Sequence, residues 1–292
     1  MLRVRGSEAP ARSSRSLVTA VRTRALWFLL RTRSTEQLRA LQDCPAWAPV
    51  DRALRSGEIL VLGGMVPRLR LSGRHFDYCG VLARSVLTGL HEPMVQEALR
   101  RTVAPGGVVL DLGAHFGTIS LIAAWLVGPQ GTVISVEPQP ACVEGIEADA
   151  RLNGFAHIRV IQAAVGAASG MIEVVLAADS AWTISSSVGE HPLETGRAMV
   201  RAVAVDDLIA TGAIPPPDVV KIDVEGSEVD VIAGMERTLT ETRPRLIAEM
   251  HDRTSAFSRA LEPFRYEMVN LDGPEPIEQA GPNVHLLASP LN

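Results

Sequence analysis

The sequence predicts an α/β fold: a doubly wound, mostly parallel sheet of seven strands, preceded by a mainly helical N-terminal extension. From about residue 104, apolar strand-like runs alternate with helical stretches, a pattern typical of βαβ units. The runs are continuously apolar, as in strands that are covered on both faces. The last two runs should close the sheet as an antiparallel pair. The predicted strands are Val108–Leu112, Thr132–Val136, Ile158–Val165, Val219–Val224, Leu246–Met250, Arg265–Leu271 and Val284–Ala288.

Helical stretches separate these strands. The predicted helices are Thr118–Val127, Ala141–Asn153 and Glu228–Thr240, and in the first of them the apolar side chains recur on one face. An insertion before the fourth strand interrupts the alternation, and we expect it to form additional strands or a hairpin. It comprises Gly170–Ala177, a serine-rich stretch at Ser185–Ser187 and Met199–Val205.

The composition favours a globular protein with one large domain and an extension. Of the 292 residues 47% are apolar, and the net charge is only −5. We place the extension at residues 1–95, with a strand pair between Ile59 and Leu71, and the main domain at residues 96–292. Nine arginines within the first 40 residues are typical of a transit peptide or a membrane-surface helix. We favour instead a helix, Ser16–Leu41, that packs on the body or on the second subunit of a homodimer.

The cysteines and the hydropathy bear on the compartment. Cys44, Cys79 and Cys142 share no spacing of a metal site or a disulfide framework, which suits a reducing cytoplasm. No apolar run approaches the ~20 residues that a membrane-spanning helix requires. We therefore expect a cytoplasmic protein without a membrane span.

A glycine turn follows the first predicted strand of the sheet. The sequence Asp111-Leu-Gly113-Ala114-His115-Phe-Gly117 leads from that strand into a helix, and in open α/β sheets ligands bind at this edge. A dinucleotide site has a glycine where this chain has Asp111. A carboxylate there would repel a pyrophosphate but suits the cationic amino group of a methionine moiety. The turn therefore favours S-adenosylmethionine over NAD as the cofactor; in a second interpretation Asp111 caps the helix.

Two further positions complete the predicted cofactor site. Glu137, followed by Pro138, ends the second strand, where an acidic residue can accept hydrogen bonds from both ribose hydroxyls. Ala164, after the third strand, is small enough to border an adenine ring.

A second signature follows the insertion, in Asp218–Glu228. Lys221, Asp223 and Glu225 alternate along an otherwise apolar strand, and burying such charges is costly unless they are paired or face a polar crevice. Together with the glycine turn, this stretch resembles the FkbM family of methyltransferases. The resemblance covers roughly residues 90–252 and rests on Glu92-Pro93, Asp111–Gly117, Glu137-Pro138, Val205–Leu208 and Lys221–Gly226.

The resemblance implies a Rossmann-like class I methyltransferase sheet, S-adenosylmethionine as the methyl donor and, usually, a hydroxyl as the acceptor. One departure is the turn itself, which reads Ala-His-Phe-Gly where the family more often has asparagine and a smaller aliphatic residue. The role of His115 is therefore left open.

Three candidate catalytic residues end neighbouring strands: Asp223, Glu249 and His251. Transfer of a methyl group to an alcohol requires removal of the hydroxyl proton, so we expect His251 or Asp223 to be the general base. In a second interpretation, Asp223 and Glu249, with Glu225 or His251 nearby, hold a divalent cation that binds the acceptor hydroxyl. A purely structural interpretation pairs Glu249 with Lys221 and His251 with a loop.

The expected acceptor is a small molecule, a natural product or a glycan, with Tyr78 and Trp182 as candidate pocket residues. The basic N-terminus would also suit a nucleic-acid methyltransferase or an RNA-binding module. Aromatic residues make up only 4% of the chain, however, and the catalytic half is acidic, so we expect no nucleic-acid partner. The motifs are also compatible with a non-catalytic cofactor-binding protein and, more remotely, with a nicotinamide-dependent oxidoreductase.

Overall fold

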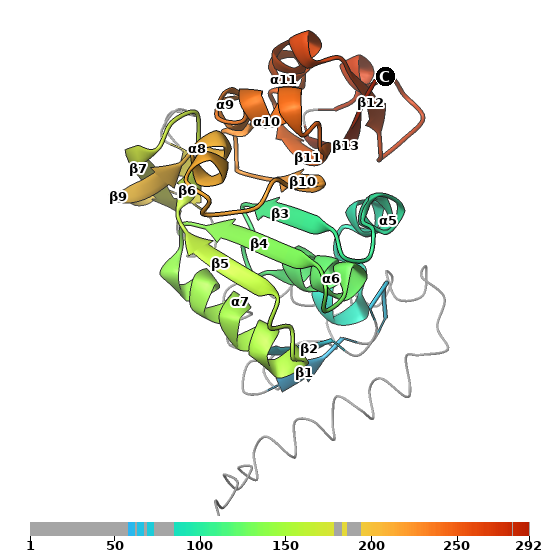
Figure 1. Cartoon of the computed structure of the whole chain (residues 1–292), viewed down its shortest axis with the longest axis vertical. Helices are drawn as coiled ribbons and strands as arrows, with labels where there is room; N and C mark the ends of the chain where they lie inside the picture. The colour runs from blue at the N-terminus through green and yellow to red at the C-terminus, as the bar shows by residue number, and fades with distance from the viewer. Residues whose placement is uncertain are drawn as a thin grey trace, which may run out of the picture.

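The computed structural model describes residues 58–61, 63–66, 69–72, 85–177, 183–185, 194–281 and 283–291 (Figure 1). The predictions for the helix Ser16–Leu41, for Tyr78 and for Trp182 lie outside these residues.

The described residues confirm the predicted fold class. Seven strands form one sheet in the order β12-β13-β11-β10-β3-β4-β5 (Figure 1). The five strands β11, β10, β3, β4 and β5 are parallel to one another. At one edge β13 runs antiparallel to both β11 and β12, so the predicted antiparallel pair closes the sheet. The strands are β3 (Val108–Leu112), β4 (Thr132–Glu137), β5 (Ile158–Gln162), β10 (Val219–Ile222), β11 (Arg245–His251), β12 (Tyr266–Asn270) and β13 (Asn283–Pro290).

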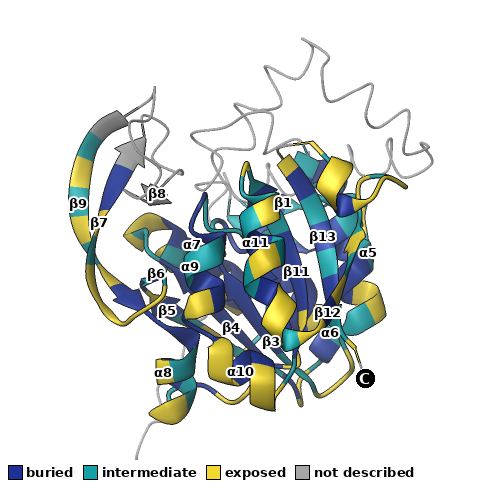
Figure 2. Cartoon of the chain, turned by 90° about the horizontal axis from the view of Figure 1, so that it is seen from above, coloured by how far each residue is buried: buried dark blue, intermediate teal, exposed yellow. Residues whose placement is uncertain are grey.

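Helices cover both faces of this sheet, as Figure 2 shows for the side that carries α9, α10 and α11. Alternate strand residues point to opposite faces. Thus Val109 belongs to the core beneath α5 and α6, whereas Leu110 belongs to the core beneath α8 to α11. The helices are α5 (Pro93–Thr102), α6 (Thr118–Val127), α7 (Pro140–Asn153), α8 (Val205–Ala210), α9 (Glu228–Ala233), α10 (Glu236–Glu241) and α11 (Thr254–Leu261).

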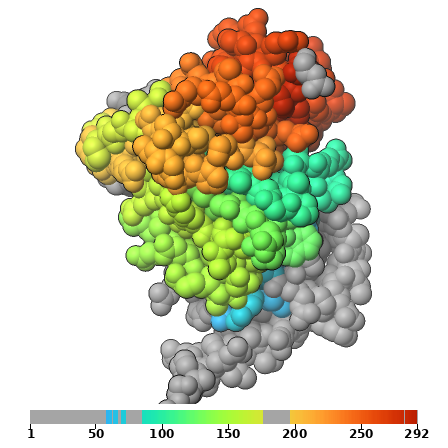
Figure 3. Space-filling model, viewed as in Figure 1, coloured from blue at the N-terminus to red at the C-terminus, as the bar shows by residue number. Residues whose placement is uncertain are grey.

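The chain reverses its direction across the sheet between β3 and β10. From β3 it proceeds outward through β4 to β5, and it then returns to the other side of β3 to form β10 and β11. On the face drawn in Figure 3, these two parts of the chain form adjoining blocks, green and orange to red. Such a switch point leaves a crevice beyond the carboxyl ends of the two central strands, where ligands of open α/β sheets bind.

The insertion forms a sheet of its own. Its strands are β6 (Ala164–Val165), β7 (Gly170–Ala177), β8 (Thr183–Ser185) and β9 (Glu194–Val203), in the order β6-β9-β7-β8. In Figure 2, β7 and β9 extend away from the main sheet. The single strand predicted over Ile158–Val165 is therefore wrong: it divides into β5 of the main sheet and β6 of the insertion sheet.

The helix predicted over Glu228–Thr240 is also divided, into α9 and α10. A side chain at Gly234 would overlap the backbone oxygen of Gly166, so the chain comes too close to the insertion there for any other residue. The Gly234 carbonyl accepts a hydrogen bond from the amide of Asp206 instead of continuing the helix.

The described part of the extension packs on the main domain. β1 (Glu58–Leu60) and β2 (Arg70–Ser72) form the predicted strand pair, which is antiparallel, with Ile59 opposite Leu71. Both residues belong to the same core as α5 and α6, and the boundary predicted between residues 95 and 96 falls within α5. No described helix is long and apolar enough to span a membrane.

Candidate active site

A cavity of about 450 Å³ opens at the switch point of the sheet, within the usual size range of a small-molecule site. Its walls come from the segments that follow β3, β4, β10 and β11, with Ile172 and Val174 of β7 on one side. The predicted site residues on its wall are Gly113, Ala114, His115, Glu137, Pro138, Ala164, Asp223, Glu249 and His251. Asp111 and Gly117 do not line it.

The turn after β3 is fixed by its contact with the loop after β10. Gly113 has φ +72°, and a Cβ there would overlap the backbone oxygen of Asp223. Its amide and that of Ala114 donate to the carbonyl of Val136, at 3.0 and 3.1 Å. Gly117, by contrast, is needed for packing, because a Cβ there would lie 2.7 Å from Ile146 Cγ1 of α7.

Lys221 links the loop after β3 to the loop after β10. Its Nζ donates to the carbonyl of Gly113 and to Asp223 Oδ2, both at 3.0 Å, and lies 3.6 Å from Asp111 Oδ1. Burial opposes the charged form of this side chain, but Asp223 and Asp111 raise its pKa above the ordinary value. The lysine predicted as a mark of the site is therefore the ionic centre that holds its two loops together.

Asp111 supports the turn from behind rather than facing the cavity. Its side chain is fully buried, and Oδ2 accepts a hydrogen bond of 2.5 Å from the Ser120 hydroxyl of α6. Burial raises the pKa of the carboxyl group, against the charge of Lys221. Asp111 is therefore buried behind the residues that line the cavity, and its direct contact with the amino group of a ligand stays a prediction.

Glu137 reaches the cavity with both oxygens anchored. Oε2 accepts a hydrogen bond from the amide of His115 and Oε1 from the amide of Gln139, each at 2.9 Å. Burial raises the pKa of this carboxyl group to about 7. A carboxylate offers about four acceptor positions, so each oxygen can still accept one hydroxyl.

His115, whose role the sequence left open, shapes the turn. It adopts a left-handed backbone conformation with φ 48°, and its ring packs at a tilt of 48° against the ring of Phe116, with the ring centroids 4.0 Å apart. Burial lowers the pKa of His115 to about 4, so the ring is neutral near pH 7.

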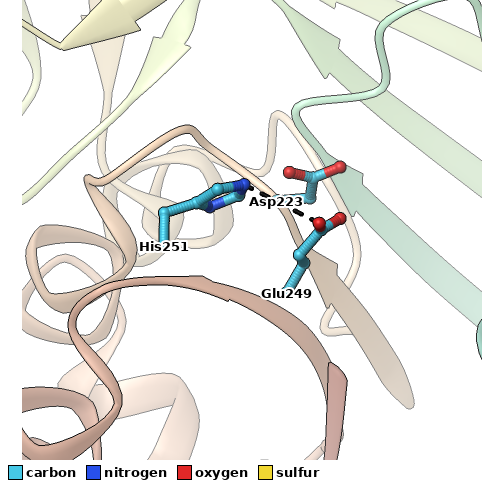
Figure 4. Close-up of side chains that lie close together, drawn as sticks. All are labelled: Asp223, Glu249 and His251. Atoms are coloured by element: carbon cyan, nitrogen blue, oxygen red, sulfur yellow. Dashed lines mark ion pairs between the residues drawn. The ribbon is translucent and has the colours of Figure 1, made fainter. Parts of the chain in front are cut away.

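Asp223, Glu249 and His251 meet at the other side of the cavity (Figure 4). One ligand-type atom from each lies within 4.8 Å of those of the other two. β10 ends at Ile222, so Asp223 begins a loop instead of extending the strand as predicted. His251 Nε2 lies 3.8 Å from Glu249 Oε1 and 3.5 Å from Glu225 Oε2. The imidazole thus faces three carboxylates.

The other ring nitrogen of His251 contacts a residue that the sequence did not single out. Nδ1 lies 2.9 Å from Oε1 of Glu228, whose side chain is fully buried at the start of α9. Burial alone would lower the pKa of His251, but this hydrogen bond and the charges of Glu225 and Asp223 raise it to about 9. Glu249 does not pair with Lys221 as the purely structural interpretation supposes; it lies 3.4 Å from His285 Nε2.

His91 and Glu92, just before α5, are further cavity residues that sequence reasoning missed. Glu92 has φ 44°, and its Oε1 lies 3.1 Å from His91 Nε2. Burial opposes its charge, yet His91 and Lys221 lower its pKa to about 2. The Glu92-Pro93 pair marked the family resemblance, but nothing in its spacing linked it to strands that follow much later in the chain.

Comparison with known proteins supports one family. The methyltransferase FkbM domain matches residues 111–271, which is more than half of the chain. A hexuronic acid methyltransferase of Haloferax volcanii is 28% identical over 146 residues, 49% of this chain and 56% of that protein. The chain therefore spans little more than half the length of that relative. The 31-O-demethyl-FK506 methyltransferase FkbM of Streptomyces tacrolimicus is 28% identical over 216 residues, 63% of this chain and 81% of that protein.

Among solved structures, a methyltransferase FkbM of Methylobacillus flagellatus superposes with a TM-score of 0.41 at 15% identity, covering 83% of this chain and 59% of that one. A precorrin-6y C5,15-methyltransferase of Geobacter metallireducens gives a TM-score of 0.41 at 14% identity over 68% and 88% of the two chains. The family match over more than half of the chain shows that the chain belongs to the methyltransferase FkbM domain family.

Proposed function

We propose that this chain transfers a methyl group from S-adenosylmethionine to a hydroxyl group of a small molecule, natural product or glycan. One observation carries the proposal: two kinds of group line a single cavity. At one side lies the carboxylate of Glu137, which can accept hydrogen bonds from ribose hydroxyls, and at the other the imidazole of His251, flanked by carboxylates. These residues end β4 and β11, which are three strand spacings apart, or about 14 Å. That distance leaves room for a donor and an acceptor side by side.

The residues of the cavity fit the proposed cofactor. Each oxygen of Glu137 keeps an acceptor position for a ribose hydroxyl, and Ala163 and Ala164 leave a flat, small-sided wall beside it. Gly113 brings the main chain to the wall without a side chain. Asp223 and Glu92 add negative charge, which suits a cationic ligand and would repel a pyrophosphate.

The chain's own residues supply orientation and proton transfer. When bound, the cofactor supplies an electrophilic methyl group on a positively charged sulfur. The fixed loops after β3 and β10 hold the reactants in line, which is the main requirement of such a displacement. His251 Nε2 accepts the proton of the acceptor hydroxyl. The positive charge of the bound cofactor would lower the pKa of His251 from about 9. The free base of His251 would therefore be favoured during turnover.

The proposal is tested by incubating the protein with donor labelled in its methyl group and a panel of acceptors. The panel contains neutral sugars, a hexuronic acid, a hydroxylated macrolide and RNA. We expect label in an alkali-stable ether of one hydroxylated small molecule. Label in RNA would favour a nucleic-acid methyltransferase, and label in no acceptor although the cofactor binds would favour a non-catalytic protein.

Cofactor affinity should depend on pH through Glu137. Ribose hydroxyls donate to the ionised carboxylate, so protonation below the pKa of about 7 removes acceptors. We expect the Kd of S-adenosylhomocysteine to rise by up to about tenfold per pH unit below 7. The Glu137→Gln variant should bind more weakly and with little pH dependence between 5 and 8. Calorimetry at several pH values measures both; an equal slope in the two proteins would contradict the role of Glu137.

Turnover should not depend on a divalent cation. Before the cofactor binds, His251 presents a positive charge to Glu225 and Glu249, so the protein itself neutralises these carboxylates in the resting site. We expect a chelator such as EDTA to leave the rate unchanged. A loss of activity that magnesium or manganese restores would instead support the cation site at Asp223 and Glu249.

A further inference from the structure

We infer that Glu228 is a positioning residue for the reaction: its buried carboxylate holds a proton on His251 Nδ1 and turns Nε2 toward the acceptor. This inference rests on the proposed function. The two residues would form a carboxylate–histidine pair that spans α9 and the end of β11.

The contacts of Glu228 support this role. Its side chain is fully buried, and Oε1 is 2.9 Å from His251 Nδ1 and 2.8 Å from the amide of Gly226. Oε2 is buried and has no hydrogen-bond partner among the described residues. A buried carboxylate is costly unless a charged or strongly polar partner compensates it. Among these contacts, only the imidazole is such a partner.

The contacts of His251 also agree with a positioning role for Glu228. An imidazole that donates from Nδ1 to a carboxylate presents the lone pair of Nε2 on the opposite side of the ring. Here His251 lines the cavity, and its Nε2 lies on the side of Glu225 and Glu249, which line the cavity too, at distances of 3.5 and 3.8 Å that are longer than hydrogen bonds. Nε2 is therefore placed to receive a hydroxyl, whereas Nδ1 is not.

The chain offers a matched control on the same helix. Asp230 lies two residues after Glu228 in the first turn of α9, is half-buried and does not line the cavity. Asp230→Asn removes one negative charge from the same helix end without touching His251. Glu228→Gln keeps an oxygen that can accept from Nδ1, whereas Glu228→Ala removes it.

The experiment is a double-mutant cycle between Glu228 and His251, measured on the full chain with an acceptor from the panel. We expect Glu228→Ala to lower kcat about 10- to 100-fold and Glu228→Gln to lose less, with the KM of the donor changed less than twofold. In the His251→Ala background, Glu228→Ala should cause no further loss of kcat. The single variant Asp230→Asn should have the kcat of the wild type. Additive losses, or a wild-type kcat in Glu228→Ala, would overturn the inference.

A second readout does not depend on activity. In protein labelled with ¹⁵N-histidine, neutral His251 should carry its proton on Nδ1 in the wild type and shift toward the Nε2 tautomer in Glu228→Ala. The same tautomer in both proteins would contradict the positioning role, even if the variant were less stable. If the wild type binds no S-adenosylhomocysteine, the proposed function fails; if it binds and the cycle is additive, only this inference fails.

Discussion

Replacing Gly113 with alanine should destabilise the protein by about 2–5 kcal/mol and abolish cofactor binding. At φ +72° an alanine is strained by ~1–2 kcal/mol. Its Cβ would also overlap the backbone oxygen of Asp223, and displacing packed backbone adds a further ~1–3 kcal/mol. Because the same contact joins the loops after β3 and β10, relieving it must open the centre of the cavity.

Gly106 provides the control for this prediction. It has φ +81°, and a Cβ there would meet nothing within 4 Å. Gly106→Ala should therefore show the conformational cost alone, about 1–2 kcal/mol, with unchanged cofactor affinity. Urea unfolding and calorimetry on both variants make the comparison. Equal stabilities of the two variants would show that the approach of the two loops is not what requires Gly113.

Replacing His251 with alanine should lower kcat by about 10²–10⁴-fold, the usual contribution of a general base. The affinity for S-adenosylhomocysteine should change only a few-fold, because Glu137 and the glycine turn lie on the other side of the cavity. Steady-state kinetics and a binding titration separate the two effects. A large loss of affinity with kcat preserved would assign His251 to the cofactor instead.

His157 is a suitable control for the loss of an imidazole. It lies outside the cavity and its Nε2 contacts the carbonyl of Ala124 at 2.9 Å. His157→Ala should therefore retain the wild-type kcat. A comparable loss in this variant would indicate that the effect at residue 251 arises from damaged folding.

The sequence predicted the sheet well because its strands are buried on both faces. β3 and α6 have the predicted bounds, and the closing pair β12–β13 was expected from the last two apolar runs of the chain. The breaks at Ala163 and Gly234 were missed, since the first depends on the pairing of β6 with β9 and the second on the close approach of Gly234 to Gly166. Hydrophobic periodicity carries no information on such contacts.

The sequence predicted those residues of the candidate site whose location follows from their position at the end of a strand. Glu137, Glu249 and His251 lie at the carboxyl ends of their strands and Asp223 directly follows one, so the parallel sheet alone brings them to one edge. The direction of the Asp111 side chain could not be predicted, because it depends on its neighbours Ser120 and Lys221. Glu228 was missed because it looked like an ordinary first residue of a helix.

The central claim is that the cavity binds S-adenosylmethionine, and titration of the wild-type chain with S-adenosylhomocysteine by calorimetry tests it most directly. We predict one site per chain with a micromolar or tighter Kd, weakened at least tenfold by Glu137→Ala in a protein that remains folded. No heat of binding from a folded wild-type protein, or equal affinity in the two proteins, would contradict the claim.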